Sequence, residues 1–247
     1  MAKAELLGRN AMNLGWFELS LDVNDFDLSC AFYEKLGFEV VDRSDEGRHA
    51  TVQRGNCRLG LYQGRSPETV LLFWQGDVPE IARDLKDKGL TFERDPAPEG
   101  KGAGALLRDP DGLAIYLINI RGEARSGPPF NDDRKLGWFV TNVAVKNLEQ
   151  SVTFYETLGF RRRPGADPDG VAMLSKDDCS IGLYRRDIIE PDTFQLTFWQ
   201  GDVTATCAEF AANGLSFLRG PDCSERGVSA VLRDPDDNII HLISESQ

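Results

Sequence analysis

The sequence predicts an α+β protein made of two tandem domains, because the chain contains one pattern twice. Four segments of the first half return in the second half, namely 15–17 as 137–139, 31–38 as 153–160, 73–77 as 198–202 and 107–111 as 232–236. The offset between equivalent residues is 122 at Trp16 and Trp138 and 125 at Trp74 and Trp199. A three-residue insertion near Asp187–Pro191 therefore separates two otherwise collinear copies.

The length of the chain agrees with two domains. The 247 residues would suit one large or two ordinary domains, and the repeat decides for two. We predict a first domain over residues 10–120, a linker over 121–135 and a second domain over 136–247. The linker is assigned because it is rich in turn-forming residues and has no apolar period.

The first unit of each copy is predicted to be a strand, a helix and three short strands. In copy one, residues 16–23 alternate, with Phe17 and Leu19 on one face and Trp16 and Glu18 on the other. A helix capped by Asp25 runs through Lys35 and ends at Gly37, which tolerates a left-handed backbone. Short strands follow near 38–41, 49–54 and 57–62.

The second unit repeats this order. A strand over 70–75 leads to a helix over 78–88, which Asp77 caps and Gly89 ends. Strands near 105–108 and 113–118 flank the turn Asp109–Gly112. The glycine-rich segment 100–104 precedes a strand rather than a helix, so we interpret it as a loop. Copy two repeats the plan with caps at Asn147 and Asp202, so each copy holds two paired βαβββ units.

Composition favours a cytoplasmic protein. A net charge of −12 argues against nucleic acid or a membrane surface as a partner, and no apolar run has the length of a membrane span. The first five residues begin no apolar stretch typical of a secretory signal. Five cysteines without CxxC spacing fit a reducing compartment better than a disulfide framework.

The repeated motifs resemble a known superfamily. The segment 31–38 (AFYEKLGF), the strand end Gly60-Leu61-Tyr62 and the Asp-Pro-Asp-Gly hairpin are similar to those of the vicinal oxygen chelate superfamily, which includes glyoxalase I, bleomycin resistance proteins and type I extradiol dioxygenases. The resemblance implies curled sheets with helices on their convex backs. It also implies an internal pseudo-dimer, existing as a monomer or a homodimer, that takes a small-molecule ligand.

The resemblance also implies where a metal would be held. The four ligand positions of the family fall on Glu18, Gly60, Val70 and Tyr116 in copy one, and on Val140, Gly182, Gln195 and His241 in copy two. Neither copy alone supplies three good donors for Zn, Ni, Mn or Fe. The sequence therefore predicts no definite cofactor, and a divalent metal is the one candidate.

The family also forms sites between the first unit of one copy and the second unit of the other. That swapped pairing would unite Glu18, Gln195 and His241 at one divalent metal, whereas the alternative leaves them as separate polar residues on open sheet faces. His49 has no partner at a suitable spacing, and we expect it at the surface.

Aromatic residues are predicted to line the concave faces. Period-2 counting puts the four tryptophans on the face of Glu18 and Val140, with the tyrosines at or near its rim, so the predicted ligand-binding residues are Trp16, Trp74, Trp138, Trp199, Tyr62, Tyr184 and Tyr116. Such rings suit a planar or cationic ligand. The alternative is that they pack the ends of the sheets or the contact between copies.

Three functions remain open from the sequence. The favoured one is binding of a small organic molecule, such as a toxic or antibiotic compound, in an aromatic cleft without a full metal site. The second is a metal-dependent lyase, isomerase or dioxygenase that uses Glu18, Gln195 and His241. The third is a structural module whose site has decayed. Whether the chain is an enzyme is left undecided.

Overall fold

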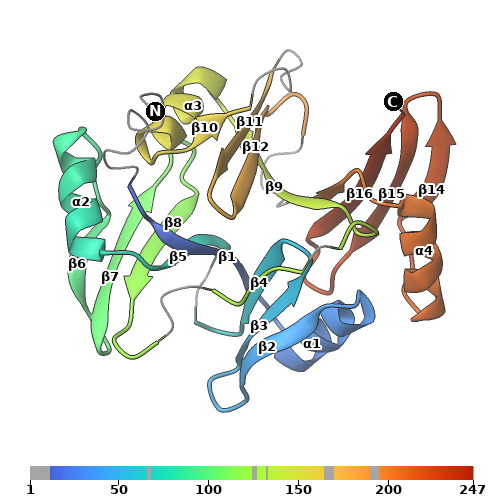
Figure 1. Cartoon of the computed structure of the whole chain (residues 1–247), viewed down its shortest axis with the longest axis horizontal. Helices are drawn as coiled ribbons and strands as arrows, with labels where there is room; N and C mark the ends of the chain where they lie inside the picture. Colours follow the sequence, from blue (N-terminus) through green and yellow to red (C-terminus); the bar gives the residue numbers. More distant parts are fainter. Residues whose placement is uncertain are drawn as a thin grey trace, which may run out of the picture.

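Each copy of the repeat forms one eight-stranded mixed sheet with two helices, which confirms the predicted α+β class (Figure 1). The computed structural model describes residues 12–65, 68–123, 127–131, 133–163, 170–189 and 195–246. The first sheet has the strand order β2-β3-β4-β1-β5-β8-β7-β6, and the second has the order β10-β11-β12-β9-β13-β16-β15-β14. Neither sheet exchanges a strand with the other copy.

The elements of copy one follow the chain in the predicted order. They are β1 (Gly15–Asp22), α1 (Phe26–Lys35), β2 (Glu39–Ser44), β3 (His49–Arg54), β4 (Cys57–Tyr62), β5 (Val70–Gln75), α2 (Val78–Asp87), β6 (Arg94–Glu99), β7 (Gly102–Arg108) and β8 (Ala114–Asn119). Asp25 and Asp77 cap the two helices by accepting hydrogen bonds from the backbone N–H of Leu28 and Glu80.

Copy two repeats this series. Its elements are β9 (Trp138–Val145), α3 (Leu148–Thr157), β10 (Arg161–Arg162), β11 (Val171–Lys176), β12 (Cys179–Arg185), β13 (Gln195–Trp199), α4 (Val203–Ala212), β14 (Arg219–Ser224), β15 (Gly227–Arg233) and β16 (Ile239–Glu245). Asn147 and Asp202 are the caps, as predicted. Gly159 and Gly214 follow the helices with φ of 92° and 82°, a conformation that glycine adopts without steric cost.

The two units of a copy join through their first strands. In copy one β1 runs antiparallel to β5, with Trp16 opposite Trp74 and Glu18 opposite Leu72. On the outer sides β1 is parallel to β4 and β5 is parallel to β8. The same arrangement holds in copy two, where Trp138 lies opposite Trp199.

Each sheet has two chemically different faces, as the alternation along its strands predicts. On one face Phe17, Phe73, Phe139 and Phe198 belong to the main hydrophobic core with residues of the helices. The opposite face is named here the helix-free face. In copy one it carries Trp16 and Glu18 on β1 and Val70, Leu72 and Trp74 on β5, none of which belongs to that core.

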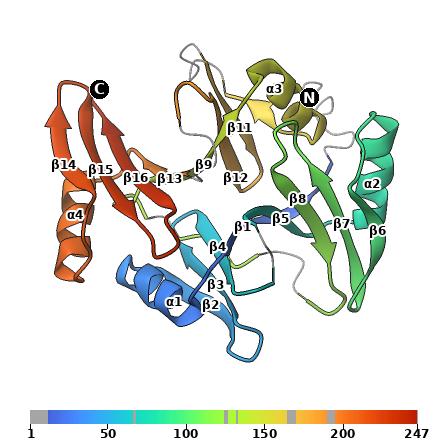
Figure 2. The same cartoon turned by 180° about the vertical axis from the view of Figure 1, so that it is seen from behind.

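The main core is shared between the copies, because the helix-bearing face of each unit packs against a unit of the other copy (Figures 1 and 2). The hydroxyl of Tyr33 on α1 donates to Asp234, in the turn between β15 and β16, at 2.8 Å. Its counterpart Tyr155 on α3 donates to Asp109, in the turn between β7 and β8, at 3.0 Å. The repeated Asp-Pro-Asp turn and the repeated helix motif therefore bind each other across the two copies.

Two local predictions need correction, and two further ones lie partly outside the described residues. The predicted βαβββ order implies a further strand after α2 and α4, but β6 and β14 were not located, because Pro96, Pro98 and Pro221 are rare inside strands and are tolerated at sheet edges. Strand β7 begins at Gly102, inside the segment interpreted as a loop. The predicted insertion near 187–191 and the domain start at 10 lie partly outside the described residues.

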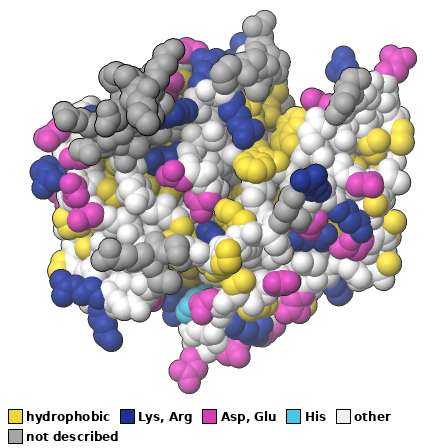
Figure 3. All heavy atoms as spheres, viewed as in Figure 1, with side chains coloured by type: hydrophobic (Ala, Val, Ile, Leu, Met, Phe, Trp, Pro, Cys, Tyr) yellow, Lys and Arg dark blue, Asp and Glu magenta, His cyan; other side chains and the backbone are white. Residues whose placement is uncertain are grey.

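No helix among the described residues is long and apolar enough to cross a membrane. On the face drawn in Figure 3, acidic and basic side chains are interspersed and no broad basic patch is visible. The net charge of −12 is that of the complete 247-residue sequence and not of this one face.

Candidate ligand-binding site

The helix-free face of the first sheet contains a fully buried carboxylate, that of Glu18 on β1. It accepts hydrogen bonds from three hydroxyl groups: Thr51 of β3 at 2.8 Å, Tyr62 of β4 at 3.0 Å and Ser20 of β1 at 3.3 Å. All three donors are uncharged and belong to the same copy. No lysine, arginine or histidine among the described residues lies within ion-pair distance of Glu18.

A glycine makes room for this carboxylate. Gly60 on β4 lies beside β1, and a Cβ atom at this position would overlap Glu18 Oε1 and the ring of Tyr62. The position predicted from the family pattern as a metal-ligand position is therefore occupied by the Glu18 side chain.

Burial dominates the acid–base properties of this cluster. Loss of hydration raises the pKa of Glu18, and the hydrogen bonds from Thr51 and Tyr62 lower it in part. Burial first, and then the neighbouring Glu18, raises the pKa of Tyr62 well above its ordinary value. Tyr62 is therefore a neutral donor over the physiological pH range.

Two indole rings lie next to the carboxylate. Trp16 and Trp74 are opposite each other on β1 and β5, and their rings stack with centroids 5.4 Å apart and planes inclined by 12°. The Nε1 atoms of both indoles are buried and have no hydrogen-bond partner. Trp74 Nε1 is near enough to Glu18 to favour its charged form, though not at hydrogen-bonding geometry. The face thus presents apolar rings, two unused N–H donors and one buried carboxyl group.

Arg58 on β4 extends the stack toward the linker. Its guanidinium lies 4.8 Å from the ring centroid of Trp16 and 4.6 Å from that of Phe130. A hollow of about 460 Å³ lies beside these rings, lined also by Pro128 and Asp178. Arg58 was not predicted from the sequence, because an arginine in an alternating strand is normally expected to be exposed to solvent.

His49 is closer to the site than the sequence suggested. Its ring stacks on that of Tyr62 with centroids 5.6 Å apart and planes inclined by 5°. Its Nε2 lies 3.9 Å from the Asp42 carboxylate. The prediction of an unpartnered surface histidine is wrong, because the β3–β4 pairing brings His49 opposite Tyr62.

The helix-free face of the second sheet has different chemistry. Val140 stands where Glu18 stands in copy one, and Trp138 is 46% exposed. Trp138 donates from Nε1 to Ser180 Oγ at 3.3 Å. Tyr184 and Trp199 are half-buried on the same face. All four predicted tryptophans therefore alternate with the core phenylalanines as expected, but only the first pair encloses an anion.

The predicted metal ligands lie in different sheets. Glu18 is in β1 of the first sheet, Gln195 in β13 and His241 in β16 of the second, and the side chain of Gln195 lies outside the described residues. Because each sheet is built from one copy, the swapped strand pairing required for a shared site does not occur. The residue opposite Glu18 is Leu72, and Val70 lies opposite Ser20. Tyr116 donates to Glu99 at 3.0 Å.

The donor set of either sheet does not fit a family metal. Each helix-free face offers one strong donor from the implied positions, Glu18 in the first and His241 in the second. A catalytic divalent ion takes three or more protein ligands. No group of three or more His, Cys, Asp or Glu side chains suited to a metal exists within the described ranges.

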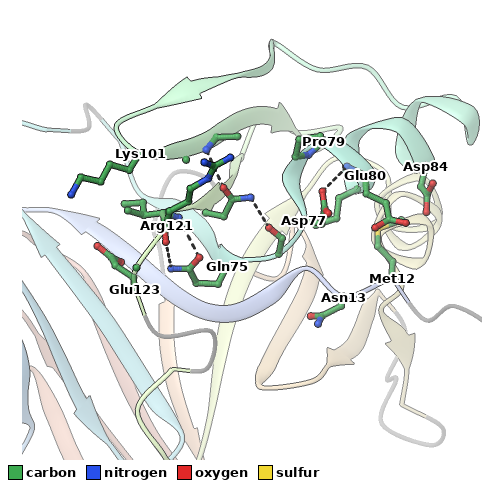
Figure 4. A pocket seen from close by; sticks show the side chains of 17 residues that line it. Met12, Asn13, Gln75, Asp77, Pro79, Glu80, Asp84, Lys101, Arg121 and Glu123 are labelled. Carbon is green, nitrogen blue, oxygen red and sulfur yellow. Dashed lines mark hydrogen bonds between the residues drawn. The ribbon is translucent and has the colours of Figure 1, made fainter.

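A larger hollow lies elsewhere, at the start of α2 (Figure 4). It measures about 910 Å³ and is lined mostly by charged and polar side chains, including Asp77, Glu80, Asp84, Lys101 and Arg121. Gln75 and Asn119, also in its wall, hydrogen-bond to backbone atoms of Ile120 and Gly76. It has neither aromatic walls nor an unpartnered buried polar group among these residues, so it is a weaker ligand site than the helix-free faces.

Comparison with known proteins agrees with this architecture. The model of the glyoxalase/bleomycin resistance protein/dioxygenase superfamily matches residues 14–117 and again residues 135–242. The chain therefore belongs to this superfamily, in a tandem two-domain form.

The individual relatives have low sequence identity to this chain or match only part of it. The chain is 33% identical over 112 residues to a bleomycin resistance protein of Klebsiella pneumoniae, covering 40% of this chain and 87% of that protein. The Mn(II)-bound glyoxalase of Novosphingobium aromaticivorans has a TM-score of 0.60 at 18% identity, covering 94% of this chain and 81% of that one. The 2,3-dioxygenase LapB of Pseudomonas sp. KL28 has a TM-score of 0.60 at 18% identity, and the match covers 94% of this chain and 92% of that one. At such identity the two structures show the fold alone.

Proposed function

We propose that this protein binds a small organic molecule carrying a cationic or N–H donor group on the helix-free face of its first sheet, without a family metal. The observation that supports this most is the buried Glu18 carboxylate beside the stacked indoles of Trp16 and Trp74. The bound molecule would fall in the class of toxic or antibiotic compounds expected from the sequence.

The electrostatic argument starts from the cost of burial. An ionised carboxylate taken out of water is unfavourable unless a charge or several hydrogen bonds compensate it. Glu18 has three hydroxyl donors and no cation at ion-pair distance among the described residues. The three hydroxyl groups compensate part of this cost, and a ligand cation would add the charge that they do not supply. It would also gain from the negative faces of the adjacent indoles.

The family relationship supports a binding role. The relative from Klebsiella pneumoniae is a bleomycin resistance protein, and it is similar to this chain over most of its own length. Bleomycin is therefore a reasonable first probe, together with the simpler cation benzyltrimethylammonium.

The test is a titration of tryptophan fluorescence with each probe. We expect quenching by at least one of them, and a loss of affinity of about tenfold or more in Glu18→Gln, which corresponds to about 1.4 kcal/mol. Trp74→Phe should weaken binding, whereas its counterpart in copy two, Trp199→Phe, should leave it within about twofold. Equal affinity of Glu18→Gln and the wild type for every probe that binds would contradict the proposal, as would the absence of binding.

The metal-dependent alternative is tested on the same protein. Mn(II), Fe(II), Zn(II) and Ni(II) are titrated into wild type, Glu18→Ala and His241→Ala, and probe binding is repeated with a chelator present. The proposal expects probe binding to survive chelation. Stoichiometric metal binding that both substitutions abolish would favour a shared metal centre and a metal-dependent enzyme instead.

A further inference from the structure

The helix-free face of the second sheet contains an amide with an unused acceptor. Asn142 on β9 is 4% exposed, and its Nδ2 donates to Thr197 Oγ1 on β13 at 2.7 Å. Its Oδ1 atom is buried and has no hydrogen-bond partner. A buried acceptor without a partner is unfavourable, and such an atom in a native protein calls for a ligand, a water molecule or another explanation.

The position of Oδ1 shows that it faces the helix-free side. A Cβ atom at Gly182 of β12 would overlap Asn142 Oδ1, so the amide oxygen lies over the glycine backbone. The same hypothetical Cβ would lie 2.8 Å from Tyr184 Cε2 and 3.2 Å from Met173 Sδ. An aromatic ring and a thioether therefore lie near the acceptor, and both groups pack well against an organic molecule.

Further polar groups lie in the next strands. Thr197 is in register with His241 on β16, which is half-buried. Burial, and then Arg219, lowers the pKa of His241, so its imidazole is uncharged at neutral pH. Trp199 is two residues beyond Thr197 on the same face, and its Nε1 atom is buried without a partner. The face thus holds an unused acceptor, an unused donor and a neutral imidazole.

The equivalent positions of the first sheet have different chemistry. Across the two copies Glu18 becomes Val140, Ser20 becomes Asn142, Leu72 becomes Thr197 and Tyr116 becomes His241. The anion is lost, and an amide, a hydroxyl and an imidazole are gained. In both copies an oxygen lies over the glycine of the fourth strand, but it is a carboxylate oxygen in the first and an amide oxygen in the second.

We propose that the second sheet carries a second ligand site, which takes an uncharged aromatic molecule bearing a hydroxyl or N–H group that donates to Asn142 Oδ1. This site is independent of the cation-binding face proposed above. The protein would therefore bind two chemically different molecules, one on each sheet.

The experiment follows the indole N–H signals of the four tryptophans by NMR, assigned with single Trp→Phe variants. Benzyl alcohol is the probe, benzyl methyl ether is the same ring without a donor, and benzyltrimethylammonium is the cation. Concentrations reach about 50 mM, because ligands of this size bind weakly. We expect benzyl alcohol to shift the Trp199 signal and to bind about threefold to tenfold more tightly than the ether.

Two substitutions make the assignment specific. Asn142→Ser installs the residue of the first copy and should reduce benzyl alcohol affinity about threefold to tenfold, with little risk to folding. Glu18→Gln should leave benzyl alcohol binding unchanged, whether or not the first site binds a cation. The proposal is overturned if benzyl alcohol does not bind, if the ether binds equally well, if Asn142→Ser has no effect, or if the shifts appear at Trp74 instead of Trp199.

Discussion

Arg58 is expected to be the most important single polar side chain at the joint between the copies. It is 2% exposed, and it donates to the carbonyl oxygens of Phe17 and Pro128, both at 2.7 Å. It also forms an ion pair of 3.2 Å with Asp178 of copy two. One guanidinium thus connects β1, the linker and the turn between β11 and β12.

The substitution Arg58→Met keeps much of the side-chain volume and removes every donor. Two backbone carbonyl groups, the Gln53 amide oxygen and one carboxylate then lose a partner, and each unsatisfied buried group costs about 1–3 kcal/mol. Asp178 keeps the backbone N–H of Phe17 as a donor, which limits the loss. Removing one partner of a buried ion pair costs about 3–5 kcal/mol. We therefore expect the free energy of unfolding to fall by about 3–5 kcal/mol.

Urea unfolding followed by tryptophan fluorescence measures this loss. The matched control is Ser180→Ala at the equivalent position of copy two, where a single hydrogen bond of 3.3 Å from Trp138 is removed. That change should cost about 0.5–1.5 kcal/mol. If Arg58→Met costs no more than Ser180→Ala, the guanidinium does not hold the joint and this reasoning is refuted.

Three further outcomes follow from the buried polar groups. The raised pKa of Glu18 means that the folded state holds its proton more tightly than the unfolded chain, so this group lowers stability as pH rises from the unfolded value of 4.5 through the folded one. Glu18→Gln should therefore become more stable relative to wild type across that interval, by at most about 1.4 kcal/mol per pH unit. Urea unfolding at pH 4 and pH 8 measures the difference in free energy of unfolding between the two proteins, and an equal difference at both pH values would contradict this expectation. Tyr33→Phe and Tyr155→Phe should each cost about 1–3 kcal/mol in chemical unfolding, because each removes one hydrogen bond to a buried aspartate that keeps its backbone donors. The two losses should add in the double variant, and strong non-additivity would argue against two separate joints. Gly60→Ala should lower stability and also reduce probe binding, because the added methyl group would displace the Glu18 side chain. If a titration shows unchanged probe binding, the ligand binds elsewhere.

The alternation of each strand was sufficient to predict its faces. Phe17 and Trp16 are neighbours in the chain, and a period of two sends one to the core and the other to the helix-free face. Helix starts were equally accessible, because a cap such as Asp25 acts within three residues. These predictions depend only on local geometry, which the sequence displays directly.

The arrangement of side chains on the helix-free faces depends on distant contacts, and it could not be predicted in the same way. Glu18 is satisfied by Thr51 and Tyr62, whose positions follow from the pairing of β3, β4 and β1 rather than from spacing. Arg58 depends on Asp178, which is 120 residues away. The family pattern gave two possible pairings of the units, and the sequence offered no means of choosing between them.

Some repeated residues make contacts between the copies, and others lie on a face of a single sheet. This difference explains why the copies agree at some positions and differ at others. The Tyr–Asp bond of one joint uses Tyr33 and Asp234, and that of the other uses Tyr155 and Asp109, so each copy supplies one half of both joints. A change in either motif would damage the contact with the other copy. The helix-free faces lie within single sheets, and a change from Glu18 to Val140 affects only its own face. A duplicated chain of this kind therefore keeps the residues of the joints alike, whereas its two helix-free faces are free to differ in chemistry.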